Sequence, residues 1–299
     1  MGYLFLALAL LFGLIKVYCG KKSSYVADCF INAIIINTVR MLTCFFIGTV
    51  IALATGIETF FFEQPKVVLI ALLSGVSIVC FTVSWLMSVN SSAYMLVEVF
   101  VMAGVFVPVI LCRIFYGESI SILQTIAGIM LVIAVYCMCS CGEKAKVRIS
   151  FNRFFLLIIC AISSGMSDFF QKVYVNEYEN LNIALFNVYT YLFAAIILLA
   201  VYIVFKLKEK EKYTLNSPII VIKPIFYYVL IMAGCLFLNL YFKTLSSKHL
   251  DAVLIYPLNQ GLAVVCSFIM SATLFKEKIN AKGIAGIIIA LIAVILINV

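Results

Sequence analysis

The segment Phe115–Gly128, with the sequence FYGESISILQTIAG, is nearly repeated as LFKEKINAKGIAG at Leu274–Gly286. Each copy follows one long apolar run and opens another. Each also has a glutamate at the junction, Glu118 in the first copy and Glu277 in the second. The two copies predict a chain that is built from two related halves.

The sequence around these copies is too apolar for a soluble protein. Apolar residues make up 66% of the chain and charged residues 11%, whereas soluble domains have about 25% charged residues. Ten apolar runs, each long enough to cross a hydrocarbon core of roughly 30 Å, lie at 1–18, 30–54, 66–87, 92–116, 120–140, 152–175, 182–205, 219–243, 249–274 and 280–299. Because backbone polar groups in lipid must be satisfied internally, the predicted fold class is all-α integral membrane, with ten transmembrane helices.

A charged connector, Gly142–Ser150, divides the chain into residues 1–141 and residues 151–299. Each half contains five of the apolar runs. Since five is odd, the second half enters the membrane with the opposite orientation, and the two bundles are expected to form inverted five-helix repeats.

The net charge of +8 comes mainly from basic residues in the connectors, so it does not indicate nucleic-acid binding. Fifteen lysines and arginines, Lys16 among them, are assigned to connectors after odd-numbered runs, and five, including Lys172 and Lys243, to those after even-numbered runs. This imbalance places the odd connectors in the cytoplasm and both termini outside.

Metal and redox chemistry are not expected. The eleven cysteines are scattered, and their one cluster, Cys137, Cys139 and Cys141, lacks a fourth ligand because the single histidine is His249. Cysteine is also a common small buried residue. With no paired-carboxylate motif either, the sequence predicts no cofactor, no metal and no catalytic residues, and thus not an enzyme.

Three ionisable residues lie deep within apolar runs, where each costs roughly 2.5–3.5 kcal/mol to insert. Glu98 is a candidate for proton coupling or cation binding, with Tyr94 on the same helix face. Arg40 suits a carboxylate or phosphate of a substrate. The alternative is that Glu98 and Arg40 form a buried ion pair that fixes the helix register. Asp168 is followed one turn later by Lys172, which favours a local structural pair or a lysine that extends to the interface.

The ninth run contains Tyr256, Pro257, Asn259 and Gln260 close together. Proline removes a backbone hydrogen bond, and broken helices at mid-membrane often line a binding site. We therefore expect Tyr256, Asn259 and Gln260 to face that site. Pro108 in the fourth run predicts a similar kink near the equivalent position.

Several other features favour structural roles. Four serines and Phe81 follow one face of the third run, where either tight packing or a hydroxyl-lined cavity wall is possible. Trp85 is expected to anchor the chain at the membrane interface. Glu118 and Glu277 are expected to stabilise the starts of the helices that follow them.

The repeated span–Glu–span–Gly elements, Ala93 through Glu118 to Gly128 and Ala252 through Glu277 to Gly286, resemble the drug/metabolite transporter superfamily in its ten-span EamA-like form. Arg40 is also similar to the family pattern. The resemblance implies a secondary transporter with two inverted five-helix repeats around a central cavity. Many members keep both termini in the cytoplasm, contrary to the charge count.

The predicted function is secondary active transport of a small metabolite, cationic or zwitterionic, across the plasma membrane by alternating access with proton coupling. The alternative is a flippase or permease for a lipid-linked or sugar-conjugate substrate on the same fold. A purely structural membrane subunit is a further reading. The expected partners are a small-molecule substrate and the lipid bilayer, without nucleic acid, and a homodimer is left open.

Overall fold

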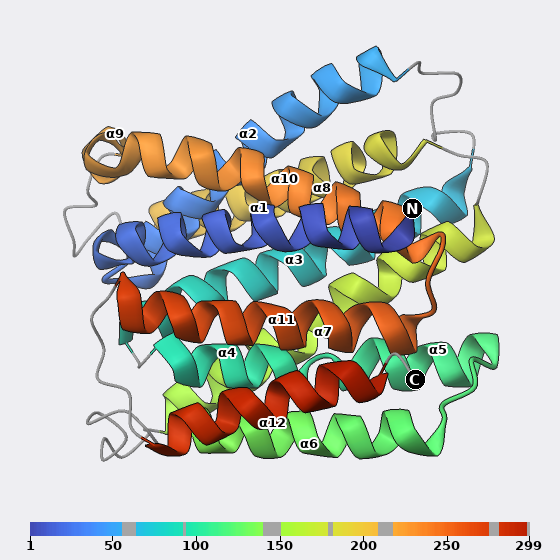
Figure 1. The fold of residues 1–299 in the computed structure, drawn as a ribbon. Coiled ribbons are helices and arrows are strands. Elements are labelled where there is room, and N and C mark those ends of the chain that lie inside the picture. Colours follow the sequence, from blue (N-terminus) through green and yellow to red (C-terminus); the bar gives the residue numbers. More distant parts are fainter. Residues whose placement is uncertain are drawn as a thin grey trace.

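The structure is a computed structural model that describes residues 1–55, 64–91, 94–139, 151–178, 182–208, 218–274 and 281–297 (Figure 1). The regular structure of these residues is entirely helical. The helices are α1 (Gly2–Ser23), α2 (Phe30–Ala54), α3 (Pro65–Ser91), α4 (Tyr94–Ala103), α5 (Phe106–Tyr116), α6 (Ile122–Cys139), α7 (Phe151–Glu177), α8 (Ile183–Lys208), α9 (Pro218–Ile222), α10 (Phe226–Ser247), α11 (Ala252–Thr273) and α12 (Ala281–Ile297).

Within the described residues, seven helices are long and apolar enough to cross a membrane, and three shorter apolar helices accompany them. The shorter ones lie at Phe100–Tyr116, Ile122–Ala134 and Ile284–Ala293. The all-α membrane fold is therefore confirmed, and the protein is a multi-pass membrane protein. Many large apolar side chains are exposed along the helices, as expected where lipid replaces water.

The helices lie roughly side by side, with both labelled ends of the chain at the same end of the bundle (Figure 1). α1 packs along α10, α2 along α8, α3 along α7, and α6 along α12. A continuous apolar core runs between them, and its largest fully buried side chains include Tyr191, Phe237 and Leu86.

The fourth apolar run forms two helices, α4 and α5, instead of one. They are separated at Gly104 and Val105, just before Pro108. At this break the backbone of α7 comes unusually close, because a Cβ atom on Gly165 would lie 2.2 Å from the carbonyl oxygen of Gly104. The kink expected near Pro108 is thus present, whereas Pro257 lies inside the uninterrupted helix α11, so the predicted break in the ninth run is wrong.

The serine face of α3 is packed rather than open. Ser74, Ser77, Ser84 and Ser88 are all buried, and Ser77 and Ser84 donate hydrogen bonds to carbonyls of their own helix. α3 contacts α7 and α8. The four serines therefore follow the packing interpretation, whereas Phe81 on the same face lines the cavity described below.

Glu118 lies in the connection between α5 and α6 but does not stabilise the start of α6. Its Oε2 accepts the backbone N–H of Ala252, 2.9 Å away at the start of α11. The start of α6 is instead capped reciprocally by Ser121 and Gln124, whose side chains each accept the other's backbone N–H. Glu118 is therefore structural as expected, although for a different helix. Glu277 lies outside the described residues.

Candidate functional site

A cavity of about 90 Å³ lies inside the bundle and is lined by residues of α1, α2, α3, α4, α7, α10 and α11. A water molecule needs roughly 10–15 Å³ of such space, so the cavity can hold several waters or a small solute. The charged residues that line it are Lys16, Arg40, Glu98, Asp168 and Lys243. Arg40, Glu98 and Asp168 were predicted, and the structure brings all three to one cavity.

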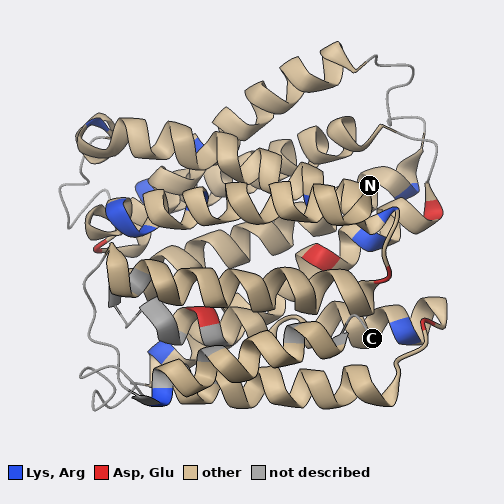
Figure 2. Ribbon diagram, viewed as in Figure 1, with Lys and Arg blue, Asp and Glu red and all other residues tan. Residues whose placement is uncertain are grey.

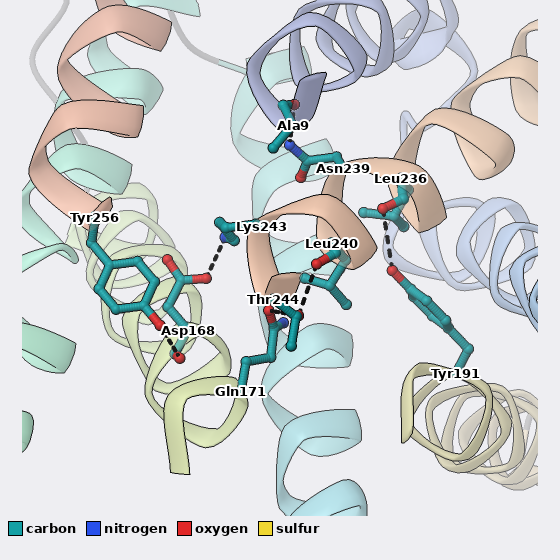
Figure 3. Close-up of polar contacts among 10 residues, drawn as sticks. All are labelled: Ala9, Asp168, Gln171, Tyr191, Leu236, Asn239, Leu240, Lys243, Thr244 and Tyr256. Carbon is teal, nitrogen blue, oxygen red and sulfur yellow. Dashed lines mark hydrogen bonds and ion pairs between the residues drawn. The ribbon is translucent and has the colours of Figure 1, made fainter. Parts of the chain in front are cut away.

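Asp168, on α7, forms an ion pair with Lys243 of α10, as Figure 3 shows. The expected partner, Lys172, is not the one that it uses. Tyr256 of α11 donates a hydrogen bond from its hydroxyl to the backbone carbonyl of Asp168, 2.8 Å away. Tyr256 is buried and is not among the residues that line this cavity, so its described polar contact is with the backbone of α7. Its place in a substrate site stays a prediction.

Lys172 forms a separate buried cluster one turn further along α7. Its Nζ lies 3.8 Å from Glu118 Oε1 and donates hydrogen bonds to the carbonyls of Ser247 and Leu250, 2.9 and 3.0 Å away. The residue is only 5% exposed, so the predicted extension to the membrane interface is wrong. Burial raises the pKa of Glu118 above its ordinary value, and the positive charge of Lys172 opposes that rise.

Arg40, on α2, is 3% exposed and donates from Nη1 to Asn37 Oδ1, 3.0 Å away. Its Nε is buried and has no hydrogen-bond partner among the described residues. Within the described part of the chain, no carboxylate forms an ion pair with Arg40. The alternative of a buried Glu98–Arg40 pair is therefore not what the structure contains.

Glu98, on α4, is 4% exposed and accepts a hydrogen bond from Trp85 Nε1, 3.4 Å away. Trp85 belongs to α3, is 7% exposed and lines the cavity. Its expected role as an interfacial anchor is therefore wrong. The indole N–H supplies the hydrogen-bond donor that a buried carboxylate requires. The sequence did not predict this contact, because the two residues are thirteen positions apart.

Lys16 and Lys243 are the two lining cations that sequence reasoning missed, because both were counted as connector residues. α1 extends from Gly2 to Ser23 and α10 from Phe226 to Ser247, so neither lysine lies in a connector. Both lysines therefore sit within helices and face the cavity. A signal was available: each lies within an apolar run, where a charge costs free energy. The remaining connector charges keep the same imbalance, and the orientation stays a prediction.

The ninth run contributes two of its predicted residues. Asn259 and Gln260, on α11, both line the cavity. The Oδ1 atom of Asn259 is buried and has no hydrogen-bond partner among the described residues. Tyr94 begins α4, but its side chain lies outside the described part of the structure, so its role stays a prediction.

The charges of the cavity do not balance within the described residues. Three cations, Lys16, Arg40 and Lys243, face two carboxylates, Glu98 and Asp168. Lys16 interacts electrostatically with the other four. Figure 2 shows acidic residues in the middle of the bundle as well as at its ends. Buried charges in a membrane bundle are costly and mark solute or ion pathways.

Sequence and structure comparisons agree with this description. Residues 153–299 match the family model described as the EamA-like transporter family. A segment of 61 residues is 33% identical to "Multidrug resistance protein EbrA" from Bacillus atrophaeus; it covers 20% of this chain and 58% of that protein. The chain thus spans little more than half the length of this relative.

One solved crystal structure superposes with a TM-score of 0.71 over 99% of this chain and 95% of its own, at 12% sequence identity, which shows a shared fold.

The fold and the cavity define the class: a multi-pass helical membrane protein with a polar chamber among its helices. The second half of the chain matches the model of the EamA-like transporter family. The predicted resemblance to the drug/metabolite transporter superfamily is therefore confirmed.

Proposed function

We propose that this protein is a secondary active transporter that carries a small solute through the charged cavity by alternating access. It is not an enzyme in this proposal, and it works in the plasma membrane. The observation that carries the proposal is the cavity itself, because it places five ionisable side chains inside an apolar helical bundle. A purely structural subunit gains nothing from burying charges that its own groups do not neutralise.

The proposed architecture is ten spans in two inverted repeats, residues 1–141 and 151–299, with α4 and α5 together forming the fourth span. The helix packing supports it. The first span of each half packs on the third span of the other, as α1 does on α10 and α7 on α3. The second spans, α2 and α8, pack on each other, and so do the fifth, α6 and α12. Exchanging the two halves leaves these pairings unchanged, as an inverted repeat requires.

The cavity lies between the two proposed repeats. Lys16, Arg40 and Glu98 come from the first half, and Asp168 and Lys243 from the second. Rocking one repeat against the other would expose a site in this position to the two sides of the membrane in turn. The ion pair between Asp168 and Lys243 lies within the second half, so such a motion leaves it intact.

Glu98 is the proposed coupling residue. It is buried, lines the cavity and belongs to the short helix α4, next to the break at Gly104. A carboxylate in such a place can bind and release a proton as access alternates. Among the predicted solute classes, the excess of cations in the cavity favours a zwitterion over a plain cation. The polar lining gives no specific support to a lipid-linked substrate.

The test is transport in proteoliposomes. A library of small metabolites is first screened for ligands that raise the thermal stability of the purified protein, since a ligand that binds only the folded state stabilises it. Uptake of the best ligand is then measured with and without a pH gradient. We expect Glu98→Gln to abolish the effect of the gradient, whereas the exposed control Glu177→Gln keeps it. Full coupling in Glu98→Gln would exclude Glu98 from this role, and uptake of no ligand at all would contradict transport.

A further inference from the structure

We propose that Arg40 and Lys16 form a subsite for an anionic group, a carboxylate or a phosphate, on the solute that occupies the cavity. This inference rests on the proposed function, because it assigns the chemistry of the solute in that same cavity. It also restricts the solute class: a solute that is only cationic does not fit.

Arg40 is held in place for this task. Asn37, one turn earlier on α2, donates from Nδ2 to the carbonyls of Ala33 and Thr82, 2.9 and 3.3 Å away. These bonds direct its Oδ1 to Arg40 Nη1. A guanidinium has five N–H donors in a rigid fork, and Asn37 accepts one of them. Arg40 therefore has an oriented fork at the cavity, and its buried Nε has no hydrogen-bond partner among the described residues.

Lys16 reaches the same cavity from α1. Among the residues that the structure describes, it forms no ion pair with a carboxylate. The two lining carboxylates have other partners, since Asp168 pairs with Lys243 and Glu98 accepts from Trp85. After the Asp168–Lys243 pair is set aside, two cations share the cavity with one carboxylate, Glu98. One anionic group on the solute restores neutrality and removes the cost of an uncompensated buried charge.

The cavity wall also offers hydrogen-bond acceptors. Asn259 Oδ1 is buried without a partner among the described residues, and Glu98 carries a carboxylate. A solute that has a donor group as well as its anionic group satisfies both the cations and the acceptors of the cavity. The expected solute is therefore small, with an obligatory anionic group and a hydrogen-bond donor.

Trp85 allows this to be measured without knowledge of the solute. It is the single tryptophan of the chain and lines the cavity. Collisional quenching of its fluorescence by iodide, by caesium and by neutral acrylamide therefore reports which ions enter. Because a local potential of a few kT changes ion concentrations severalfold, we expect iodide to quench about threefold more strongly than caesium, after each is normalised to acrylamide.

The variants test the two residues. Arg40→Gln and Lys16→Met are each expected to lower iodide quenching relative to acrylamide, while Arg40→Lys keeps it. The exposed control Lys66→Met changes nothing. Glu98→Gln should raise iodide quenching further. Gel filtration shows which variants fold, and if Arg40→Gln does not, Lys16→Met and Arg40→Lys still decide the question.

Competition with iodide distinguishes a carboxylate from a phosphate as the anionic group that the subsite prefers. Acetate or inorganic phosphate, added at constant ionic strength, is expected to protect Trp85 from iodide, and the stronger protector names the group. Caesium quenching equal to that of iodide, an unchanged iodide response in Lys16→Met, or protection by neither anion would overturn the subsite. If acrylamide itself failed to quench, the cavity would be closed to water-borne solutes, and the proposed function would fail first.

Discussion

Two lysines within the helical bundle, Lys172 and Lys16, have opposite surroundings. Lys172 is enclosed by Glu118 and by the carbonyls of Ser247 and Leu250, all within 3.8 Å. Lys16 faces the cavity and has no ion-pair partner in the described part of the chain. Lys172 thus links α7 to the end of α10, to the connection before α11 and to Glu118, which is a structural role. Lys16 has no such partner among the described residues, and the proposed subsite gives its charge a role.

The contrast separates charges that the protein neutralises itself from charges that it does not. A buried charge that the protein neutralises itself holds helices in place, whereas one that it leaves unneutralised costs stability and is retained only for a task. In this protein both kinds occur within one membrane bundle. Substitutions can test whether the neutralised charges stabilise the fold and whether the unpaired ones do not.

The largest effect is expected from Asp168→Asn, which leaves the charge of Lys243 buried without its ion-pair partner. Breaking a buried pair by removing one member costs about 3–5 kcal/mol. The measurement is chemical unfolding of the protein in detergent. The double variant Asp168→Asn/Lys243→Met should recover most of the loss, because it removes the orphaned charge. A double variant as unstable as the single one would show that the charge is not the cause.

A smaller effect is expected from Thr244→Val on α10. Its hydroxyl donates to Gln171 Oε1 of α7, 2.8 Å away (Figure 3), and the loss of such a bond costs about 1 kcal/mol. The matched control is Thr43→Val, whose hydroxyl bonds only to the carbonyl of Val39 in its own helix among the described residues. Equal losses in both variants would mean that the contact between α7 and α10 adds nothing specific.

The smallest effect concerns pH and Glu118. Burial raises the pKa of this carboxyl in the folded state, so the folded protein holds its proton more tightly than the unfolded chain does. Stability from this group is therefore present below the ordinary glutamate pKa and is lost as pH rises through the raised value. Thermal unfolding across this range should show the decline in the wild type but less of it in Glu118→Gln. An unchanged decline would assign it to other groups.

Much of the fold follows from the sequence because lipid imposes a simple rule. A run of about 20 apolar residues must be helical to satisfy its backbone, so the boundaries of α2 match the prediction, and those of α8 differ by only a few residues. Breaks were harder. Pro257 is accommodated inside α11, whereas the fourth span separates at Gly104, where α7 approaches too closely for any side chain.

The residues of the candidate site were predictable where inserting them into a membrane costs free energy. Arg40, Glu98 and Asp168 stand out because charge within an apolar run is expensive, and all three line the cavity. Their partners were not predictable, because pairing depends on which helices become neighbours. The sequence suggests Lys172 for Asp168 from spacing alone, but Lys243 approaches from α10, 75 residues away.

Lys16 lines the cavity and has no ion-pair partner among the described residues, whereas Lys172, outside the cavity, is paired with Glu118. The most direct test of this contrast is the same substitution at both lysines, Lys16→Met and Lys172→Met, with thermal unfolding measured in one detergent without added solute. We predict that Lys172→Met lowers the melting temperature, because two carbonyls and Glu118 lose their partner. Lys16→Met should leave it unchanged or raise it. A fall in Lys16→Met as large as that in Lys172→Met would contradict the account.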